Sequence, residues 1–182
     1  DVRHHITLMK KYLEDKDYDA LNEYLNNYQK SIPDEHIFFC ENSAVNAILS
    51  YFSEQARTFG ITYTVSASIP KHISISETDL SILFGNLLEN AIDACNAQSG
   101  EDKKIIVRAK TDDHSLCVTI DNTFSGSLDI DQEGHFVSSK HEGLGLGTES
   151  IKSIAEKYGG VCQFESNNGM FYASVMCFKD HA

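Results

Sequence analysis

NLLENAIDA, residues 86–94, is the stretch of sequence that decides the fold of this chain. Its polar residues fall at spacings of three and four, so an α-helix would place them along one side. Apolar residues cover most of the remaining surface, and no lysine occurs between Asp79 and Glu101. We therefore predict a helix that is buried nearly all round, except for one narrow polar stripe formed by Asn86, Glu89, Asn90 and Asp93.

The stripe carries oxygen ligands without neighbouring cations, a combination that suits a hard metal ion. A glycine-rich stretch with a lysine, SSKHEGLGLG, follows at residues 138–147. Glycines allow the backbone amides to approach phosphate oxygens closely, and Lys140 supplies a mobile positive charge. The two stretches together predict a site for a nucleoside triphosphate held through Mg²⁺. Taken singly, the stripe could be no more than a solvated face, and the glycines could mark a plain turn.

The composition is that of a soluble globular protein, with 41% hydrophobic and 23% charged residues. The net charge of −12 argues against nucleic acid as a partner, because a phosphate backbone needs a basic surface. Five cysteines, odd in number and mostly within apolar runs, suit reduced buried thiols in the cytoplasm rather than disulfides or a zinc site.

No apolar run approaches the roughly 20 residues that span a bilayer, and no signal peptide is visible. The chain begins at Asp1 without an initiator methionine. We therefore expect a fragment of a longer protein, whose contact with a membrane would come only through a sensor segment absent from this chain.

Residues 1–33 have the pattern of a helical hairpin. Apolar residues recur at spacings of three and four on both sides of the polar turn EDKDYD, giving each helix one narrow seam. The seam residues are Val2, Ile6, Met9 and Leu13 in the first helix, and Leu21, Leu25, Tyr28 and Ile32 in the second. Because so small a hairpin cannot cover these seams, we predict a homodimer in which two hairpins form a four-helix bundle. Pro33 ends the hairpin.

Residues 34–182 alternate helices and strands. Helices are predicted from Val45 to a stop at Gly60, from Ser76 through the polar stripe, and from Thr148 to Tyr158. The Ser76 side chain can cap its helix, with Asp79 three residues on. Strands are predicted over ITYTV, KIIVRA, LCVTI, VCQFES and MFYASVMCF, and a long loop over residues 123–147. TDDHS joins the second and third strands as a hairpin, and the NNG turn joins the last two. The expected fold class is an α/β sandwich, in the sense of an α+β domain, with a mixed sheet packed on one face by helices.

From about Glu41 to Phe178 the chain resembles the ATP-binding domain of the GHKL or Bergerat type. Sensor histidine kinases, DNA gyrase B, MutL and heat-shock chaperone ATPases share this domain. NLLENAIDA resembles the asparagine box of that family, and GLGLGTESIKSIAEKYGG resembles its last glycine box with the following helix. SSK, with Phe136 just before it, resembles the loop that reaches the terminal phosphates.

The resemblance implies ATP and Mg²⁺ as cofactors and assigns roles to residues of this chain. Asn90 would be the magnesium ligand and Glu89 a catalytic residue on the same helix face. The residues that would contact the nucleotide are Asn86, Asn90, Asp93, Asn122, Lys140, Gly143, Gly145 and Gly147. Family members commonly carry an aspartate and two glycines where this chain has Asn122, Phe124 and Gly126. The asparagine can still accept from the adenine amino group but without a charge, so we expect weaker binding. The alternative role for Asn122 is only to shape a turn after a strand.

The stretch RHH at residues 3–5 resembles the start of the dimerisation hairpin in peptide-sensing quorum kinases, and Asn122 fits the same branch. The resemblance implies His4 as the phosphoacceptor. His4 lies two residues beyond Val2, so it projects about 200° away from the seam, where a nucleotide domain could reach it. His5 stands where the family usually has an acidic residue that would hold and deprotonate the phosphoacceptor.

The resemblance therefore implies the cytoplasmic part of a two-component sensor histidine kinase, a phosphoprotein and a transferase in signal transduction. It would bind ATP with Mg²⁺, phosphorylate His4, and pass the phosphoryl group to a response-regulator aspartate. Two alternatives stay open: a degenerate dimeric scaffold that binds ATP without autokinase activity, and a serine kinase or ATPase on the same fold.

Overall fold

The computed structural model describes residues 2–30, 37–98, 100, 102–125 and 146–178, and their side chains except at 2–4, 26–30 and 146. The chain divides into two compact units, Asp1–Ile37 and Phe38–Ala182. Each unit is described below by itself.

The first unit is a hairpin of two antiparallel helices, α1 (Val2–Glu14) and α2 (Tyr18–Lys30). Lys16 adopts a left-handed conformation with φ of 56° in the turn between them, and the Asp17 carboxylate accepts a hydrogen bond from the Ala20 amide at 3.0 Å. The contacts between the helices involve Tyr24, whose hydroxyl lies 2.5 Å from His5 Nδ1 and whose ring centroid lies 6.0 Å from that of Tyr12.

The second unit contains a five-stranded mixed sheet in the order β1-β2-β3-β5-β4. β1 pairs with β2 in parallel, and the other neighbours are antiparallel. The strands are β1 (Thr62–Ser68), β2 (Lys104–Thr111), β3 (Ser115–Thr123), β4 (Val161–Asn167) and β5 (Met170–Phe178). The two hairpins predicted from the sequence, β2 with β3 and β4 with β5, are both present.

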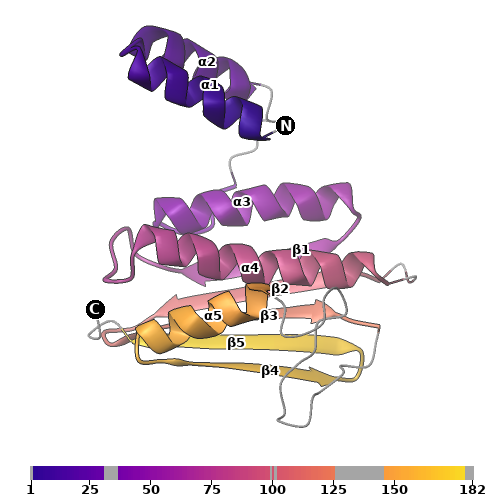
Figure 1. Cartoon of the computed structure of the whole chain (residues 1–182). Helices are drawn as coiled ribbons and strands as arrows, with labels where there is room; N and C mark the ends of the chain where they lie inside the picture. The colour runs from indigo at the N-terminus through magenta and orange to yellow at the C-terminus, as the bar shows by residue number, and fades with distance from the viewer. Residues whose placement is uncertain (1, 31–36, 99, 101, 126–145, 179–182) are drawn as a thin grey trace. The chain divides into compact units, whose positions relative to one another are not determined.

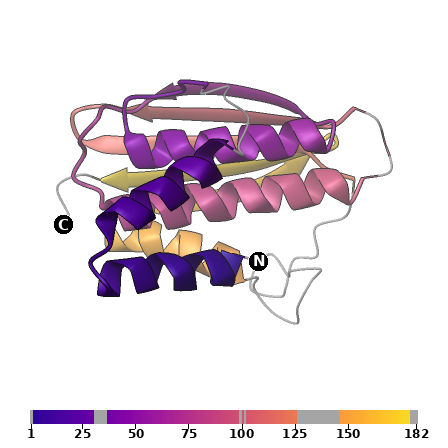
Figure 2. The same ribbon diagram turned by 90° about the horizontal axis from the view of Figure 1, so that it is seen from above.

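Three helices cover one face of this sheet (Figures 1 and 2): α3 (Ser43–Thr58), α4 (Glu77–Asn96) and α5 (Leu146–Lys157). α3 packs on β1, α4 lies over β2 and β3, and α5 lies over β4 and β5. The strands alternate accordingly, because side chains that point toward the helices are buried while their neighbours face the other side. In β2 and β3 the buried positions include Ile105, Val107, Val118 and Ile120. This is the two-layer sandwich predicted from the sequence.

The helix that carries the polar stripe begins as the sequence predicts. The Ser76 hydroxyl accepts a hydrogen bond from the Asp79 amide at 3.1 Å and donates to the Asp79 carboxylate at 2.6 Å. This reciprocal pattern is an N-terminal cap that fixes the first turn of α4. α5 differs from the prediction, because it starts at Leu146 rather than at Thr148. Gly147 is therefore helical, and its backbone does not belong to a loop.

Gly160 follows α5 at a point where the chain passes very close to β5. A Cβ atom at this position would lie 1.8 Å from the Met176 carbonyl oxygen. Any side chain here would push β5 away, so glycine is required for the step from helix to strand. The turn between β4 and β5 uses left-handed residues, Asn168 and Gly169, as the NNG sequence predicts.

All five cysteines are free, as the sequence predicts. Cys40, Cys95 and Cys177 are buried and Cys162 is half-buried, whereas Cys117 is exposed on the sheet face opposite the helices. The expectation of buried thiols is therefore wrong for Cys117. Successive side chains of the strand LCVTI point to opposite faces of the sheet, and that of Cys117 points away from the helices. None of the helices within the described ranges has the length and apolar composition that crossing a membrane requires.

Candidate nucleotide-binding site

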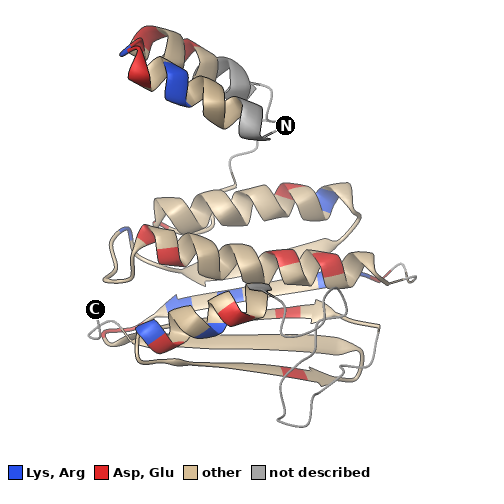
Figure 3. Ribbon diagram, in the orientation of Figure 1, with Lys and Arg blue, Asp and Glu red and all other residues tan. Residues whose placement is uncertain are grey.

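The polar stripe of α4 is present in the structure. Asn86 and Asp93 are half-buried, Glu89 and Asn90 are exposed, and the apolar residues between them are packed into the core. Those core residues are Leu83, Phe84, Leu87, Leu88, Ala91 and Ile92. α4 contains no lysine or arginine, and Figure 3 shows its acidic residues at its start and in its second half. The stripe is therefore a line of oxygen ligands on an otherwise apolar helix.

The first turn of α5 lies directly against this stripe. A Cβ atom at Gly147 would stand 3.2 Å from Asn86 Oδ1 and 3.7 Å from Asn90 Nδ2. The Asn86 amide nitrogen donates to the Ile82 carbonyl oxygen at 2.9 Å, which turns its oxygen toward Gly147. Two stretches far apart in the sequence therefore come into contact here, and a Cβ atom at position 147 would force the Asn86 side chain to shift.

Asn122 lies on the sheet below the helices. It is part of β3 and 2% exposed, and its amide nitrogen donates to the Thr123 carbonyl oxygen at 2.9 Å. Its position in the alternation of β3 places it on the helix-facing side, after Val118 and Ile120. Since Asn122 is paired within the sheet, it does not serve merely to shape a turn after a strand.

An aromatic cluster lies next to Asn122. Phe171 of β5 is its direct cross-strand partner, and the Phe171 ring packs with those of Phe164, at 6.1 Å, and Phe124, at 6.2 Å. The Phe124 amide donates to the Gly169 carbonyl oxygen at 2.8 Å. The phenylalanine that replaces a family glycine therefore has a packing role at the end of β3.

Thr123 is a site residue that the sequence did not reveal. Its hydroxyl accepts hydrogen bonds from the Gln98 side chain at 2.9 Å and from the Lys104 amide at 3.0 Å. The Cys95 thiol, near the end of α4, lies 3.5 Å from the same hydroxyl, and burial raises its pKa. These contacts tie the C-terminal end of α4 to β2 and β3 beside Asn122. A threonine after a strand carries no signal of such a role.

The remaining predicted residues are placed as follows. Lys140, Gly143 and Gly145, with Ser138, Phe136 and Gly126, lie outside the described residues. His4 lies in α1, with only its backbone described. His5 is half-buried in the hairpin, where it meets the Tyr24 hydroxyl.

The donor set of α4 fits magnesium bound together with phosphate. Within the described parts of the chain, no three histidine, cysteine or acidic residues are close enough to hold a metal ion by themselves. Mg²⁺ in nucleotide sites usually keeps only one or two protein ligands and takes the rest from phosphates and water. The exposed amide of Asn90, beside the first turn of α5, matches that need.

Comparison with known proteins gives a consistent result. Residues 75–177, more than half of the chain, match the sequence profile of the GHKL domain. A relative in Bacillus subtilis (strain 168), named as a probable C4-dicarboxylate sensor kinase, is 25% identical over 138 residues. That alignment covers 71% of this chain and 25% of the relative, so this chain spans about a quarter of the length of that protein.

Two solved structures share the fold. The catalytic domain of the histidine kinase ThkA superposes with a TM-score of 0.58 at 20% identity, covering 75% of this chain and 91% of that domain. ThkA in complex with the response regulator protein TrrA superposes with a TM-score of 0.57 at 18% identity. That match covers 99% of this chain and 59% of the other. The fold is therefore that of histidine kinase catalytic domains.

Proposed function

Because this chain belongs to the GHKL domain family, we propose that it is the ATP-binding and phosphoacceptor core of a two-component sensor histidine kinase. One observation carries the proposal: Gly147 at the start of α5 lies against Asn86 and Asn90 of α4. Backbone amides at a helix start, next to amide oxygens of a second helix, form a place where phosphate and Mg²⁺ can be held together.

The residues of α4 would divide the binding of ATP and Mg²⁺ among them. Asn90 would hold Mg²⁺ through its amide oxygen, and Asn86 would position the phosphates at the start of α5. Asp93 would take part through the same face, and Glu89, which is exposed, would act as the catalytic residue of the stripe. Bound Mg²⁺ neutralises charge on the phosphates. Lys140, Gly143 and Gly145 are proposed to contact the phosphates from the segment before α5.

The base of the nucleotide would be recognised from the sheet. In the proposal, Asn122 Oδ1 accepts from the adenine amino group, since its Nδ2 is already used in the bond to Thr123. Phe171, paired with Asn122, presents an aromatic side chain to the same region. Contact with an aromatic side chain can replace part of the binding free energy that the charge of an aspartate would have contributed.

Phosphoryl transfer is proposed to follow the family scheme. The γ-phosphoryl group leaves ADP and forms a bond to an imidazole nitrogen of His4, and a response-regulator aspartate then receives it. His5 would take the place of the usual acidic neighbour. Its Nδ1 atom forms a hydrogen bond with the Tyr24 hydroxyl, and this bond fixes the orientation of the ring. ThkA, which has the same fold, was solved with a response regulator protein.

A homodimer is part of the proposal. Ile6, Leu13 and Leu25 of the predicted seams are 48%, 52% and 40% exposed in the single hairpin. A second copy that packed on these residues would remove three large apolar side chains from water, which favours a four-helix bundle. The upstream sensor would be membrane-bound, with this chain on the cytoplasmic side. The RHH stretch and Asn122 support membership of the quorum-kinase branch as part of the same proposal.

The test is to incubate the protein with Mg²⁺ and ATP labelled at the γ-phosphate. We expect acid-labile label on the wild-type protein and none on His4→Gln. The matched control is His72→Gln, which changes an exposed histidine of the second unit and should keep the label. ATP binding without label would favour the scaffold. Acid-stable label would favour a serine kinase, and phosphate release without label an ATPase.

A further inference from the structure

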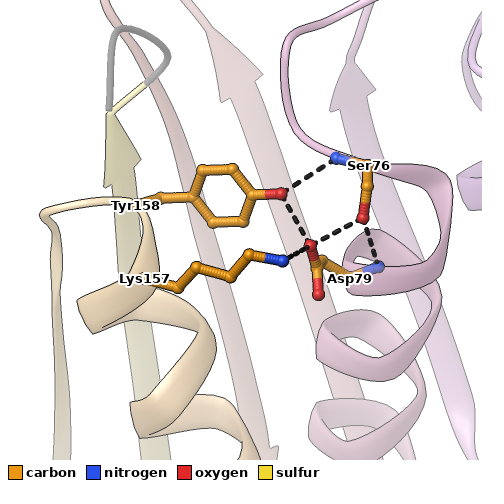
Figure 4. Close-up of polar contacts among 4 residues, drawn as sticks. All are labelled: Ser76, Asp79, Lys157 and Tyr158. Atoms are coloured by element: carbon orange, nitrogen blue, oxygen red, sulfur yellow. Dashed lines mark hydrogen bonds and ion pairs between the residues drawn. The ribbon is translucent and has the colours of Figure 1, made fainter. Parts of the chain in front are cut away.

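A cluster of four residues joins the start of α4 to the end of α5 (Figure 4). Three donors converge on one oxygen atom, Oδ2 of Asp79: the Ser76 hydroxyl at 2.6 Å, the Lys157 ammonium at 2.7 Å and the Tyr158 hydroxyl at 2.6 Å. The Tyr158 oxygen also accepts from the Ser76 backbone amide at 3.1 Å. Of the four residues, Ser76 and Asp79 come from α4 and its cap, and Lys157 and Tyr158 from the end of α5.

The cluster is largely withdrawn from water. Asp79 is 9% exposed and Tyr158 2%, while the Lys157 side chain is 58% exposed and approaches from the surface. The hydrogen bond from Lys157, followed by those from Ser76 and Tyr158, holds the pKa of Asp79 at about 2. A buried carboxylate with three donors is a directional contact, which tolerates little displacement of its partners.

Asp79 belongs to the same line of α4 as the nucleotide stripe. Asn86 and Asn90 follow it by seven and eleven residues, which is about two and three turns of helix. α5 therefore lies along this line in the opposite direction. Its first turn meets Asn86 and Asn90 through Gly147, and its end meets Asp79 through Lys157 and Tyr158.

The apolar contacts of α5 do not by themselves fix its position along α4. Ile151, Ile154 and Ala155 are buried in the core, and apolar packing of this kind is non-directional. A rotation of α5, or a shift by a fraction of the 1.5 Å rise per residue, could keep much of the apolar contact. It would, however, break the bonds to Asp79.

We propose that Asp79, Lys157 and Tyr158 are positioning residues that set where the start of α5 meets the nucleotide. We call these three residues the α5 anchor. The proposal rests on the proposed function, because the start of α5 matters for catalysis only if nucleotide binds there. The anchor acts at a distance through the rigid helix, and no anchor residue needs to touch ATP.

The experiment uses Lys157→Gln and Tyr158→Phe. Each substitution removes one hydrogen bond between the end of α5 and Asp79 and leaves the volume of the substituted side chain nearly unchanged. Lys152→Gln is the matched control for the first variant, because Lys152 is exposed on the same helix and has no described bond to α4. Tyr51→Phe is the matched control for the second variant, because Tyr51 is 59% exposed on α3 and has no described bond to α4 or α5.

Two readouts separate positioning from stability. The first is the NMR signals of the side-chain amides of Asn86 and Asn90 without nucleotide, which should shift in both anchor variants and stay in place in both controls. The second is calorimetry with a non-hydrolysable ATP analogue and Mg²⁺. We expect the anchor variants to raise Kd about threefold to tenfold, as remote coupled residues commonly do, and the controls to leave it unchanged.

The outcomes are distinct. Unchanged amide signals and unchanged Kd in both anchor variants, with only a lower melting temperature, would reduce the cluster to a structural contact and overturn the inference. Equal effects of Tyr51→Phe and Tyr158→Phe would also overturn it. If the wild-type protein binds no nucleotide, the proposed function fails, and the amide signals alone still decide whether the anchor positions α5.

Discussion

Gly147 in the first turn of α5 lies so close to Asn86 of α4 that a Cβ atom at position 147 would stand 3.2 Å from Asn86 Oδ1. We predict that Gly147→Ala weakens nucleotide binding about tenfold, equivalent to about 1.4 kcal/mol, because the added methyl group displaces the Asn86 side chain from its position at the start of α5. The fold should remain intact, since alanine is favoured over glycine in a helix. Calorimetry with ATP and Mg²⁺, combined with a thermal melt, measures both effects.

Gly85→Ala is the matched control for this change. Gly85 is the neighbour of Asn86 in α4, and a Cβ atom there would meet nothing within 4 Å. It should raise the free energy of unfolding by about 0.5–1 kcal/mol and leave nucleotide affinity unchanged. Equal binding losses in the two variants would mean that the contact with Asn86 is not what matters.

Asn90→Ala should abolish the magnesium-dependent part of ATP binding. Asn90 is exposed and lies outside the core, so its removal should change the free energy of unfolding by less than about 0.5 kcal/mol. Titrations with and without Mg²⁺ test this. Affinity that still rises on adding Mg²⁺ would contradict Asn90 as the metal ligand.

Asn122→Asp should affect nucleotide binding and stability in opposite directions. A carboxylate makes a stronger bond to the adenine amino group, so affinity should rise about fivefold, or about 1 kcal/mol. Without nucleotide, the free energy of unfolding should fall by about 1–3 kcal/mol, because the donor to the Thr123 carbonyl is lost and a charge is buried. The measurement is the ATP-induced increase in melting temperature, which should be larger than in the wild-type protein. A smaller increase would place the base elsewhere.

Much of this architecture is readable from local patterns. The polar stripe, the cap at Ser76 and the β4–β5 hairpin follow from helical spacing, a capping pair and the NNG turn. Asp79 was recognised only as part of that cap. Its bond to Lys157 joins residues 78 positions apart, and no local pattern encodes such a distance. The packing of Phe124 with Phe171 was missed for the same reason, since the sequence indicates only that a glycine is replaced.

Asp79 should make stability depend on pH in the acid range. The pKa of an aspartate in an unfolded chain is about 3.9, and in the folded protein Asp79 has a pKa of about 2. Because the pKa is lower in the folded protein, the contribution of ionised Asp79 to the free energy of unfolding is complete above about pH 4. It is lost as the pH falls toward 2. The pKa difference corresponds to roughly 2–3 kcal/mol of unfolding free energy.

The measurement is urea unfolding of the wild-type protein and Asp79→Asn between pH 5 and 2. The difference between their unfolding free energies should shrink as the pH falls. Asp102→Asn is the control, because Asp102 forms an exposed ion pair with Lys104 and such pairs contribute little. If the wild-type protein remained more stable than Asp79→Asn by the same amount at pH 2, the Asp79 carboxylate would be excluded as the source of the pH dependence.

Leu13→Asp should convert the proposed dimer to a monomer. Leu13 is 52% exposed in the single hairpin, so the substitution costs the monomer little, whereas it would bury a charge at the interface between two copies. Light scattering coupled to gel filtration gives the mass. Lys10→Asp changes an exposed position of the same helix outside the predicted seam and should leave the mass unchanged. A wild-type monomer would remove the dimer from the proposal.

The outward phase of Cys117 has a practical consequence. Burial raises the pKa of the Cys40, Cys95, Cys162 and Cys177 thiols, the last to about 11, so these four stay protonated and shielded at neutral pH. Thiolate is the species that reacts with maleimides. A fluorescent maleimide should therefore attach selectively at Cys117, on the sheet face opposite the helices. The native chain thus supplies its own attachment point for an optical reporter, without any cysteine having to be added or removed.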